Sequence, residues 1–213
     1  MSFRTLYDSP LVATLLPCVA SAVVIALAQR KRGLVRAYGT VFGAAIAADA
    51  FLNGAWSPVK PGTAWATAVA VFFVIFGDFR YFVVLQEGLH TAHKLVRAAA
   101  WAFVVPVTSQ LVRWRFPRIE HDERSTFLLY ELLFFALAGA IDVLLVGRAR
   151  DVRLARAATR FELLQYGTWI AADVGLVLTA HDVFYLVRIA ANLLYYVAFV
   201  PVMMRLLERR ETA

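Results

Sequence analysis

The sequence has few of the residues on which soluble proteins and structural metal sites depend. One cysteine, Cys18, occurs in 213 residues, which excludes a disulfide framework and a cysteine-based metal site. Charged residues make up only 17% of the chain, whereas hydrophobic residues make up 61% and the mean hydropathy is +0.66. A soluble domain of this length carries far more polar surface. The composition therefore predicts an integral membrane protein.

Lysine is also scarce, and its positions exclude one class of membrane protein. The three lysines are Lys31, Lys60 and Lys94, and all three fall in loops between apolar stretches. Microbial rhodopsins are seven-helix proteins of similar size, but they need a lysine in the last helix to bind retinal. Retinal is therefore excluded, and we predict no cofactor.

Catalytic and metal-binding motifs are missing as well. The sequence has no nucleotide-binding loop, nucleophile elbow or zinc-protease helix motif. His90 and His93 are spaced i, i+3 and would share one face of a helix, which makes them the only candidate pair for a metal. The predicted topology places His121 and His181 on the opposite side of the membrane, so the four histidines cannot form one site. We predict no metal.

Long apolar stretches fill the remainder of the chain. Each has about 20 residues, which is enough to cross a hydrocarbon core of about 30 Å as a helix. We predict an all-α polytopic membrane protein with a single seven-helix transmembrane domain over residues 1–213. Pro106 and Pro201 fall inside these stretches and should kink their helices without ending them. The predicted spans are residues 11–29, 37–56, 63–86, 95–112, 127–147, 161–180 and 183–207.

The distribution of Lys and Arg predicts the orientation. With the N-terminus outside, 14 of the 22 Lys and Arg residues fall in cytoplasmic segments and 6 fall outside. Cytoplasmic loops are enriched in these residues, so we predict an outside N-terminus and a cytoplasmic C-terminus in the plasma (inner) membrane. The positive charge is thus explained by topology, and no nucleic-acid partner is predicted.

Two stretches match at an offset of 124 residues. Gly43, Ile46, Ala47, Ala48, Asp49 and Leu52 correspond to Gly167, Ile170, Ala171, Ala172, Asp173 and Leu176. The match suggests a parallel repeat of three helices, a linker helix and three more, although Ala-rich helices also match by chance. This plan resembles the SWEET sugar transporters and their PQ-loop relatives. The resemblance is in the plan alone, because Pro17 has no partner in the fifth span and no proline-glutamine dipeptide occurs, so no residues are carried over.

Charged and polar residues inside the spans are the candidate site. A charge in the hydrocarbon costs several kcal/mol unless it is paired or hydrated. Asp49 and Asp173 should each lie about 18 Å from the cytoplasmic edge, at 1.5 Å per residue. We predict an outer-to-middle layer of Asp49, Asn53, Glu131, Asp173, Arg188 and Asn192. An inner layer holds Asp78, Arg80 and Asp142, and Tyr166, Trp169 and Tyr195 share faces with the acids.

These residues support three functional hypotheses. The first is a transporter or channel-like protein with an acid-lined interior, coupled to a proton or cation or carrying a small molecule. The second is a non-catalytic membrane subunit or seven-helix ligand sensor, in which acids pair with arginines. For each acid, pairing alone explains its presence about as well as transport does. A membrane-embedded enzyme is third, because no catalytic residues are identified. The expected partners are the lipid bilayer and a homo-oligomer or membrane complex.

The predicted topology can be tested with reporters at the two ends of the chain. A reporter fused after Ala213 should be active in the cytoplasm, and a tag placed before Met1 should be accessible from outside. Protease protection and membrane-impermeant labelling measure both. Labelling at the opposite sides would overturn the assignment of every span's direction.

Overall fold

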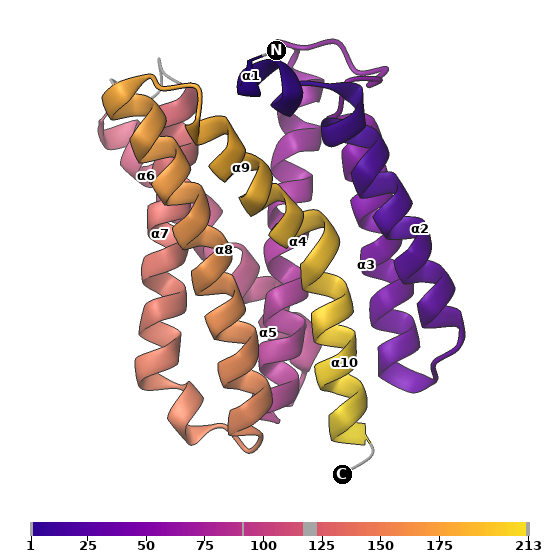
Figure 1. The fold of residues 1–213 in the computed structure, drawn as a ribbon. Helices are drawn as coiled ribbons and strands as arrows, with labels where there is room; N and C mark the ends of the chain where they lie inside the picture. Colours follow the sequence, from indigo (N-terminus) through magenta and orange to yellow (C-terminus); the bar gives the residue numbers. More distant parts are fainter. Residues whose placement is uncertain (1, 91, 117–122, 212–213) are drawn as a thin grey trace. The chain divides into compact units, whose positions relative to one another are not determined.

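The computed structural model describes residues 2–90, 92–116 and 123–211, and these contain no strand. The structure is 85% helical, which confirms the all-α fold class (Figure 1). The helices are α1 (Phe3–Tyr7), α2 (Leu16–Gln29), α3 (Gly33–Leu52), α4 (Ala64–Leu89), α5 (Lys94–Ala102), α6 (Val104–Arg115), α7 (Glu123–Leu144), α8 (Val152–Thr179), α9 (Phe184–Leu193) and α10 (Phe199–Glu211). Wider π-helical turns at Leu11–Leu15 and Leu194–Ala198 lead into α2 and α10, and a 3-10 turn at Val146–Arg148 follows α7.

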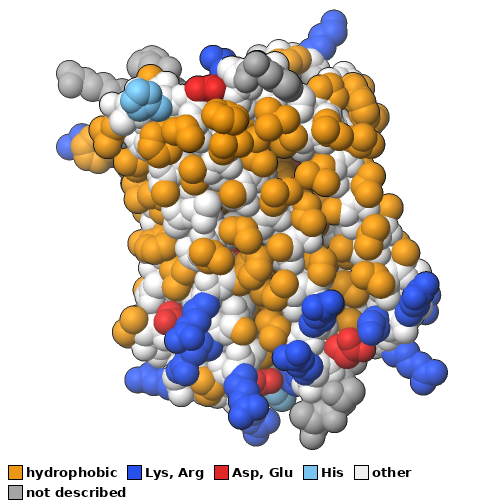
Figure 2. Space-filling model, in the orientation of Figure 1, with side chains coloured by type: hydrophobic (Ala, Val, Ile, Leu, Met, Phe, Trp, Pro, Cys, Tyr) orange, Lys and Arg blue, Asp and Glu red, His pale blue; other side chains and the backbone are white. Residues whose placement is uncertain are grey.

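Within the described residues, six helical segments are long and apolar enough to cross a membrane, and the chain is a polytopic membrane protein. The segments are Leu11–Gln29, Gly33–Leu52, Ala64–Leu89, Lys94–Arg115, Arg124–Arg148 and Phe184–Arg210. Their surfaces agree with this assignment, since Leu11, Leu15, Val19, Val23 and Leu27 form an exposed apolar stripe along the first segment. Figure 2 shows hydrophobic side chains over most of the face that it draws.

The predicted sixth span, residues 161–180, corresponds to the second part of α8. This helix has 28 residues and is not among the six apolar segments. Its second part itself contains Glu162, Gln165 and Asp173, which lower its mean hydropathy, and its first part carries the exposed Arg153, Arg156 and Arg160. The second predicted span also needs correction, because α3 begins at Gly33 and ends at Leu52, whereas residues 37–56 were expected.

Three prolines lie beside irregular turns. Proline has no N–H, and its ring clashes with the carbonyl four residues earlier, so a regular helix cannot pass it unchanged. The turn of residues 11–15 precedes Pro17, and that of residues 194–198 precedes Pro201. Phe103 separates α5 from α6 just before Pro106. Pro201 therefore widens its helix, whereas Pro106 follows a one-residue interruption that the sequence did not predict.

The chain forms two compact units. The first consists of Met1–Gly77 with Asn192–Ala213, and the second consists of Asp78–Ala191. The predicted single domain stays a prediction. Helix α4 begins in the first unit and ends in the second, whereas the last helical segment does the reverse.

Small residues bring helices together in the first unit. Helix α3 packs against α2 and α10. At Gly39, an added Cβ would lie 2.6 Å from Met204 Sδ and 2.8 Å from Ala28 Cβ. One helical turn further, the Ser21 hydroxyl donates a hydrogen bond to the Gly43 carbonyl. Close packing of this kind stabilises helices in a membrane, where lipid removes the hydrophobic driving force between them.

The second unit is built around the α7–α8 pair, which its aromatic residues hold together. Phe134 of α7 stacks on Tyr166 of α8, with ring centroids 4.2 Å apart. Tyr81 of α4 contacts Phe134 edge-on and forms a 3.0 Å hydrogen bond with Thr159 of α8. Gly88 near the end of α4 accepts a hydrogen bond from the Asp151 N–H, just before α8 begins. These contacts fix the interior face of α8 against both α4 and α7.

Gly39→Ala tests the close packing of α3. The new methyl group would overlap Met204 and Ala28, so we expect the free energy of unfolding to fall by about 1–3 kcal/mol. Gly139→Ala in α7 is the matched control, because nothing lies within 4 Å of its added Cβ. It should be neutral or slightly stabilising. Thermal unfolding in detergent measures both, and equal effects of the two substitutions would contradict this packing.

Candidate functional site

A column of buried polar side chains follows one face of α8 in the second unit. Thr159, Glu162, Gln165, Tyr166 and Asp173 are all buried. Their spacings of three, four and seven residues place them along one side of a helix. Such a stripe inside an apolar protein requires partners for each group, because lipid and neighbouring apolar side chains supply none.

Asp78 lies at the centre of this column. Its carboxylate accepts a 2.6 Å hydrogen bond from the Tyr166 hydroxyl and a second hydrogen bond from the Tyr130 hydroxyl of α7. The side chain is buried, with a relative exposure of 2%. Asp78 is 14 residues from the start of α4 and 11 from its end. Asp78 therefore lies near the middle of α4 and is bonded to Tyr166 near the middle of α8, whereas its predicted depth in the inner third stays a prediction.

Arg80 and Glu162 form the next part of the column. Both are buried, and the positive charge of Arg80 stabilises the carboxylates of Glu162 and Asp78. Gln165 donates a 3.3 Å hydrogen bond to Glu162. Sequence reasoning missed Glu162, because the predicted span began at residue 161 and placed this acid at the membrane edge. Helix α8 begins nine residues earlier, so Glu162 lies well inside it.

Asp142 lies near the column but is less buried than the residues that form it. It is half-buried in the last turn of α7, and its charge acts on the Tyr81 hydroxyl together with that of Glu162. One Asp142 carboxylate oxygen has no hydrogen-bond partner among the described residues. Of the predicted inner layer, Arg80 and Asp78 are brought together, and Asp142 is linked to them through Tyr81 and Glu162.

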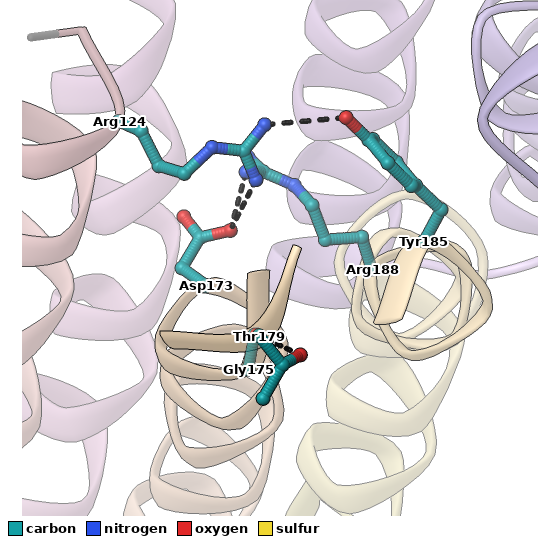
Figure 3. A network of polar contacts seen from close by, with 6 residues as sticks. All are labelled: Arg124, Asp173, Gly175, Thr179, Tyr185 and Arg188. Atoms are coloured by element: carbon teal, nitrogen blue, oxygen red, sulfur yellow. Dashed lines mark hydrogen bonds and ion pairs between the residues drawn. The ribbon is translucent and has the colours of Figure 1, made fainter. Parts of the chain in front are cut away.

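The predicted ion pair between Arg188 and Asp173 is confirmed (Figure 3). Arg188 Nη1 of α9 donates to Asp173 Oδ1 at 2.5 Å. Arg124 Nη1 lies 3.7 Å from the same oxygen, and Arg124 Nη2 donates to the Tyr185 hydroxyl at 3.4 Å. Sequence reasoning placed Arg124 in an outer loop and missed it. Because α7 begins at Glu123, Arg124 instead belongs to the first turn of a helix that packs against α8.

Glu131 is the second acid at this end of the second unit. It lies two turns after Arg124 on α7 and has a relative exposure of 6%. Its charge is repelled by Asp173 and attracted by Arg188 and Arg124. The sequence placed Glu131 with Asp173 and Arg188, and the structure brings the three together. We call Arg124, Glu131, Asp173 and Arg188 the four-charge cluster.

Trp169 is the remaining predicted site residue of α8. Its ring contacts that of Tyr166 edge-on, with centroids 5.4 Å apart. The side chain is half-buried. Trp169 therefore lies along α8 between the Asp78 bonds and the four-charge cluster, as expected for residues that share a helix face.

The first unit holds the other predicted site residues around Asp49. The Tyr196 hydroxyl donates to Asp49 Oδ2 at 3.1 Å, and Asn53 Nδ2 donates to Oδ1 at 2.7 Å. Asp49 lies in the last turn of α3, and the exposed Asn53 caps that helix. The expected depth of about 18 Å stays a prediction for Asp49, although α3 begins and ends four residues earlier than predicted and so places Asp49 nearer the end of its helix.

Tyr195 and Asn192 belong to the first unit as well. The Tyr195 hydroxyl donates to the Phe73 carbonyl at 3.4 Å, and its ring contacts that of Tyr196. Asn192 is half-buried. The predicted outer-to-middle layer draws on residues of both units, and its existence stays a prediction, as do the roles of all these residues in a ligand or ion path.

The histidine pair does not have the predicted helical arrangement. Helix α4 ends at Leu89, and His90 and His93 have positive φ angles of 54° and 52°. They therefore lie in a turn and do not share a helix face. Among the described residues, no group of three or more His, Cys, Asp or Glu side chains could hold a metal ion. His121 lies outside the described residues.

Comparison with known proteins adds no relative: no family model, curated protein or solved structure matches the chain. Functional argument therefore depends on the side chains of the two units.

Arg188→Ala tests the ion pair. Removing the guanidinium leaves the buried Asp173 carboxylate with the more distant Arg124, so we expect a loss of about 3 kcal/mol in unfolding free energy. Arg124→Ala should cost less, since its side chain is 31% exposed against 15% for Arg188.

A double variant provides the control. Adding Asp173→Asn to Arg188→Ala removes the orphaned charge and should recover part of the loss. Chemical denaturation in detergent gives the unfolding free energies of the parent, Arg188→Ala, Asp173→Asn and the double variant, which form a double-mutant cycle. Additive losses in the double variant would contradict direct pairing.

Proposed function

We propose that this protein is a membrane transporter or channel-like protein whose polar interior moves a proton or a cation. The observation that carries the proposal is the buried polar column of the second unit. Four acids, Asp78, Glu131, Glu162 and Asp173, are buried within one helical unit. Intramembrane acids at this density are costly, and in known membrane proteins they mark ion and proton pathways.

The connections within the column favour a proton over a larger substrate. Tyr166 donates its hydroxyl proton to Asp78 and lies on α8 two turns from Asp173. A hydroxyl both donates and accepts, so it can pass a proton between carboxylates without leaving its place. Tyr130 offers a second hydroxyl to the same acid. Among Asp78, Tyr130 and Tyr166, a proton can therefore move along groups that are already hydrogen-bonded.

The finer architecture that we propose is seven spans in a parallel repeat, in which α8 is the sixth span and adds to the six apolar segments. Helix α8 is long enough to cross, and the arginines of its first part suit a cytoplasmic headgroup region. The composition of the two units supports the repeat. Each unit has a packed helical hairpin, α2–α3 or α7–α8, together with parts of α4 and of the last helical segment. Asp49 and Asp173, which match at the offset of 124, are both buried.

A non-catalytic subunit or ligand sensor is the second candidate, and the four-charge cluster favours it. Two arginines form ion pairs with the same oxygen of Asp173, and such ion pairs fix the relative positions of the helices that carry them. A protein of this kind needs its acids paired but needs no transfer between them. The two candidates differ in whether charge moves through the column.

Proton flux into liposomes separates the candidates. The purified full chain is reconstituted with a pH-sensitive dye inside, and a potassium gradient with valinomycin drives uptake. Asp78→Asn keeps the shape of the side chain but cannot carry a proton, so we expect about a tenfold or larger fall in flux, which corresponds to about 1.4 kcal/mol in the barrier.

Glu208→Gln is the matched control. Glu208 pairs with Lys31 at 2.6 Å on a partly exposed surface of the first unit, whereas Asp78 belongs to the second unit. The flux of this variant should equal that of the parent protein. Absence of flux in the parent under proton, sodium and potassium gradients would reject transport and favour the subunit.

A further inference from the structure

We infer that the exposed side of α8 binds an anionic phospholipid, with arginines contacting the phosphate and the following turns of the helix lying along the acyl chains. The arginines are Arg153, Arg156 and Arg160, and we call them the arginine face. The site lies outside the buried column, so it does not depend on the proposed transport.

The start of α8 carries positive charge that its own acids leave unneutralised. Residues 148–160 contain five arginines and a single acid, Asp151. The Asp151 carboxylate is used at the start of the helix, where it accepts a 2.9 Å hydrogen bond from the Leu154 N–H. Within the described residues, none of the five arginines forms an ion pair. The segment therefore presents its charge to an anion from outside the chain.

Helical spacing gathers the arginine face on one side of α8. Its members are three and four residues apart, and all three are exposed. Ala155, Ala158 and Thr159 lie on the opposite side and are buried. On that side, Thr159 forms its 3.0 Å hydrogen bond with Tyr81 of α4. The same turns of α8 thus carry interior contacts on one side and the arginine face on the other.

Further along the exposed side, the helix changes from charged to apolar. Leu164 lies one turn after Arg160 and is 57% exposed. Thr168, one turn later, donates its hydroxyl to the Leu164 carbonyl at 2.7 Å, so this hydroxyl needs no partner from outside. Charged turns followed by apolar turns match a phospholipid, whose headgroup and chains follow one another along the membrane normal. A soluble anion would use the arginines but not the apolar turns.

The length of α8 places this change at a suitable depth. The helix has 28 residues. At 1.5 Å per residue it is about 42 Å long, whereas the hydrocarbon core is about 30 Å thick. About 12 Å of helix therefore extends beyond the core, and the arginine face covers about 10 Å of the helix axis. The arginines then lie in the headgroup layer and Leu164 lies in the hydrocarbon.

The choice of arginine favours phosphate as the bound group. A guanidinium is planar and presents paired N–H donors that match two phosphate oxygens. Residues 148–160 contain no lysine. Clusters of basic residues beside a membrane span attract anionic lipids. A zwitterionic lipid carries its own ammonium group, which competes with the arginines for the phosphate, so we expect selection of anionic over zwitterionic lipids.

Thermal unfolding of the full chain in an uncharged detergent tests the site. Dioleoylphosphatidylglycerol is added in steps, and parallel samples receive dioleoylphosphatidylcholine or inorganic phosphate. A ligand that binds only the folded protein raises the unfolding temperature. Phosphatidylglycerol should raise it at a low mole fraction. Phosphatidylcholine should not, because its charge is balanced, and inorganic phosphate should not, because it has no chains to lie along Leu164.

A triple variant removes the arginine face. Arg153→Gln, Arg156→Gln and Arg160→Gln change exposed side chains to another good helix former, so the protein should fold. The variant should need about tenfold or more phosphatidylglycerol for the same rise in unfolding temperature, since each basic residue near an anionic headgroup strengthens binding by about fivefold.

A second triple variant is the matched control for charge. Arg30→Gln, Arg32→Gln and Arg205→Gln remove the same charge from exposed positions of the first unit, and its response should equal that of the parent. Native mass spectrometry counts the phosphatidylglycerol bound to each protein and does not depend on stability. Equal responses of the parent to the two lipids, or equal losses in the two variants, would overturn the inference. A rise with inorganic phosphate equal to that with phosphatidylglycerol would assign the arginines to a soluble anion instead.

Discussion

Hydrocarbon gives the side chains of this protein no water, so a buried acid must find its hydrogen bonds inside its own helical unit. This constraint accounts for the placement of the tyrosines. Asp78 is held by two phenol hydroxyls and Asp49 by a phenol and an amide. Asp173 is the exception, because it is bonded by guanidinium groups. The three acids therefore have similar burial but different electrostatic surroundings.

That difference separates a structural role from a functional one. A carboxylate fixed by two arginines is neutralised in place and contributes to helix position. A carboxylate held by hydroxyls has hydrogen bonds but no full positive charge within the same contacts, and it can gain or lose a proton without breaking an ion pair. In the second unit, both kinds lie on one face of α8. The structural and functional explanations of the charges are thus not exclusive, since the four-charge cluster can position the helix on which Tyr166 meets Asp78.

Hydropathy and spacing predicted the helices well, because a span of about 20 apolar residues has few alternatives in a membrane. The ion pair between Arg188 and Asp173 could also be predicted, because a short loop makes α8 and α9 neighbours and the spacing sets which faces meet. Arg124 and Glu162 could not, because their roles depend on where α7 and α8 begin, and helices that extend past their apolar core carry polar residues that hydropathy assigns to loops or span edges. Tyr130 lies inside a predicted span, but its bond to Asp78 depends on how α7 packs against α4, which spacing along one helix does not give. Likewise, the sequence did not place Asp49 in the last turn of α3, because the helix begins and ends four residues before the predicted span.

The exposed fraction of the side chains decreases from one end of the buried column to the other. Along the four-charge cluster, the exposed fraction of the side chain falls from 31% at Arg124 to 15% at Arg188 and to zero at Asp173. Further along α8, Tyr166, which donates a hydrogen bond to Asp78 of α4, and Glu162 are both buried. The Asp173 carboxylate is thus paired with arginines that are partly exposed, whereas Asp78 is enclosed by neighbouring side chains, and the two acids therefore have different electrostatic surroundings.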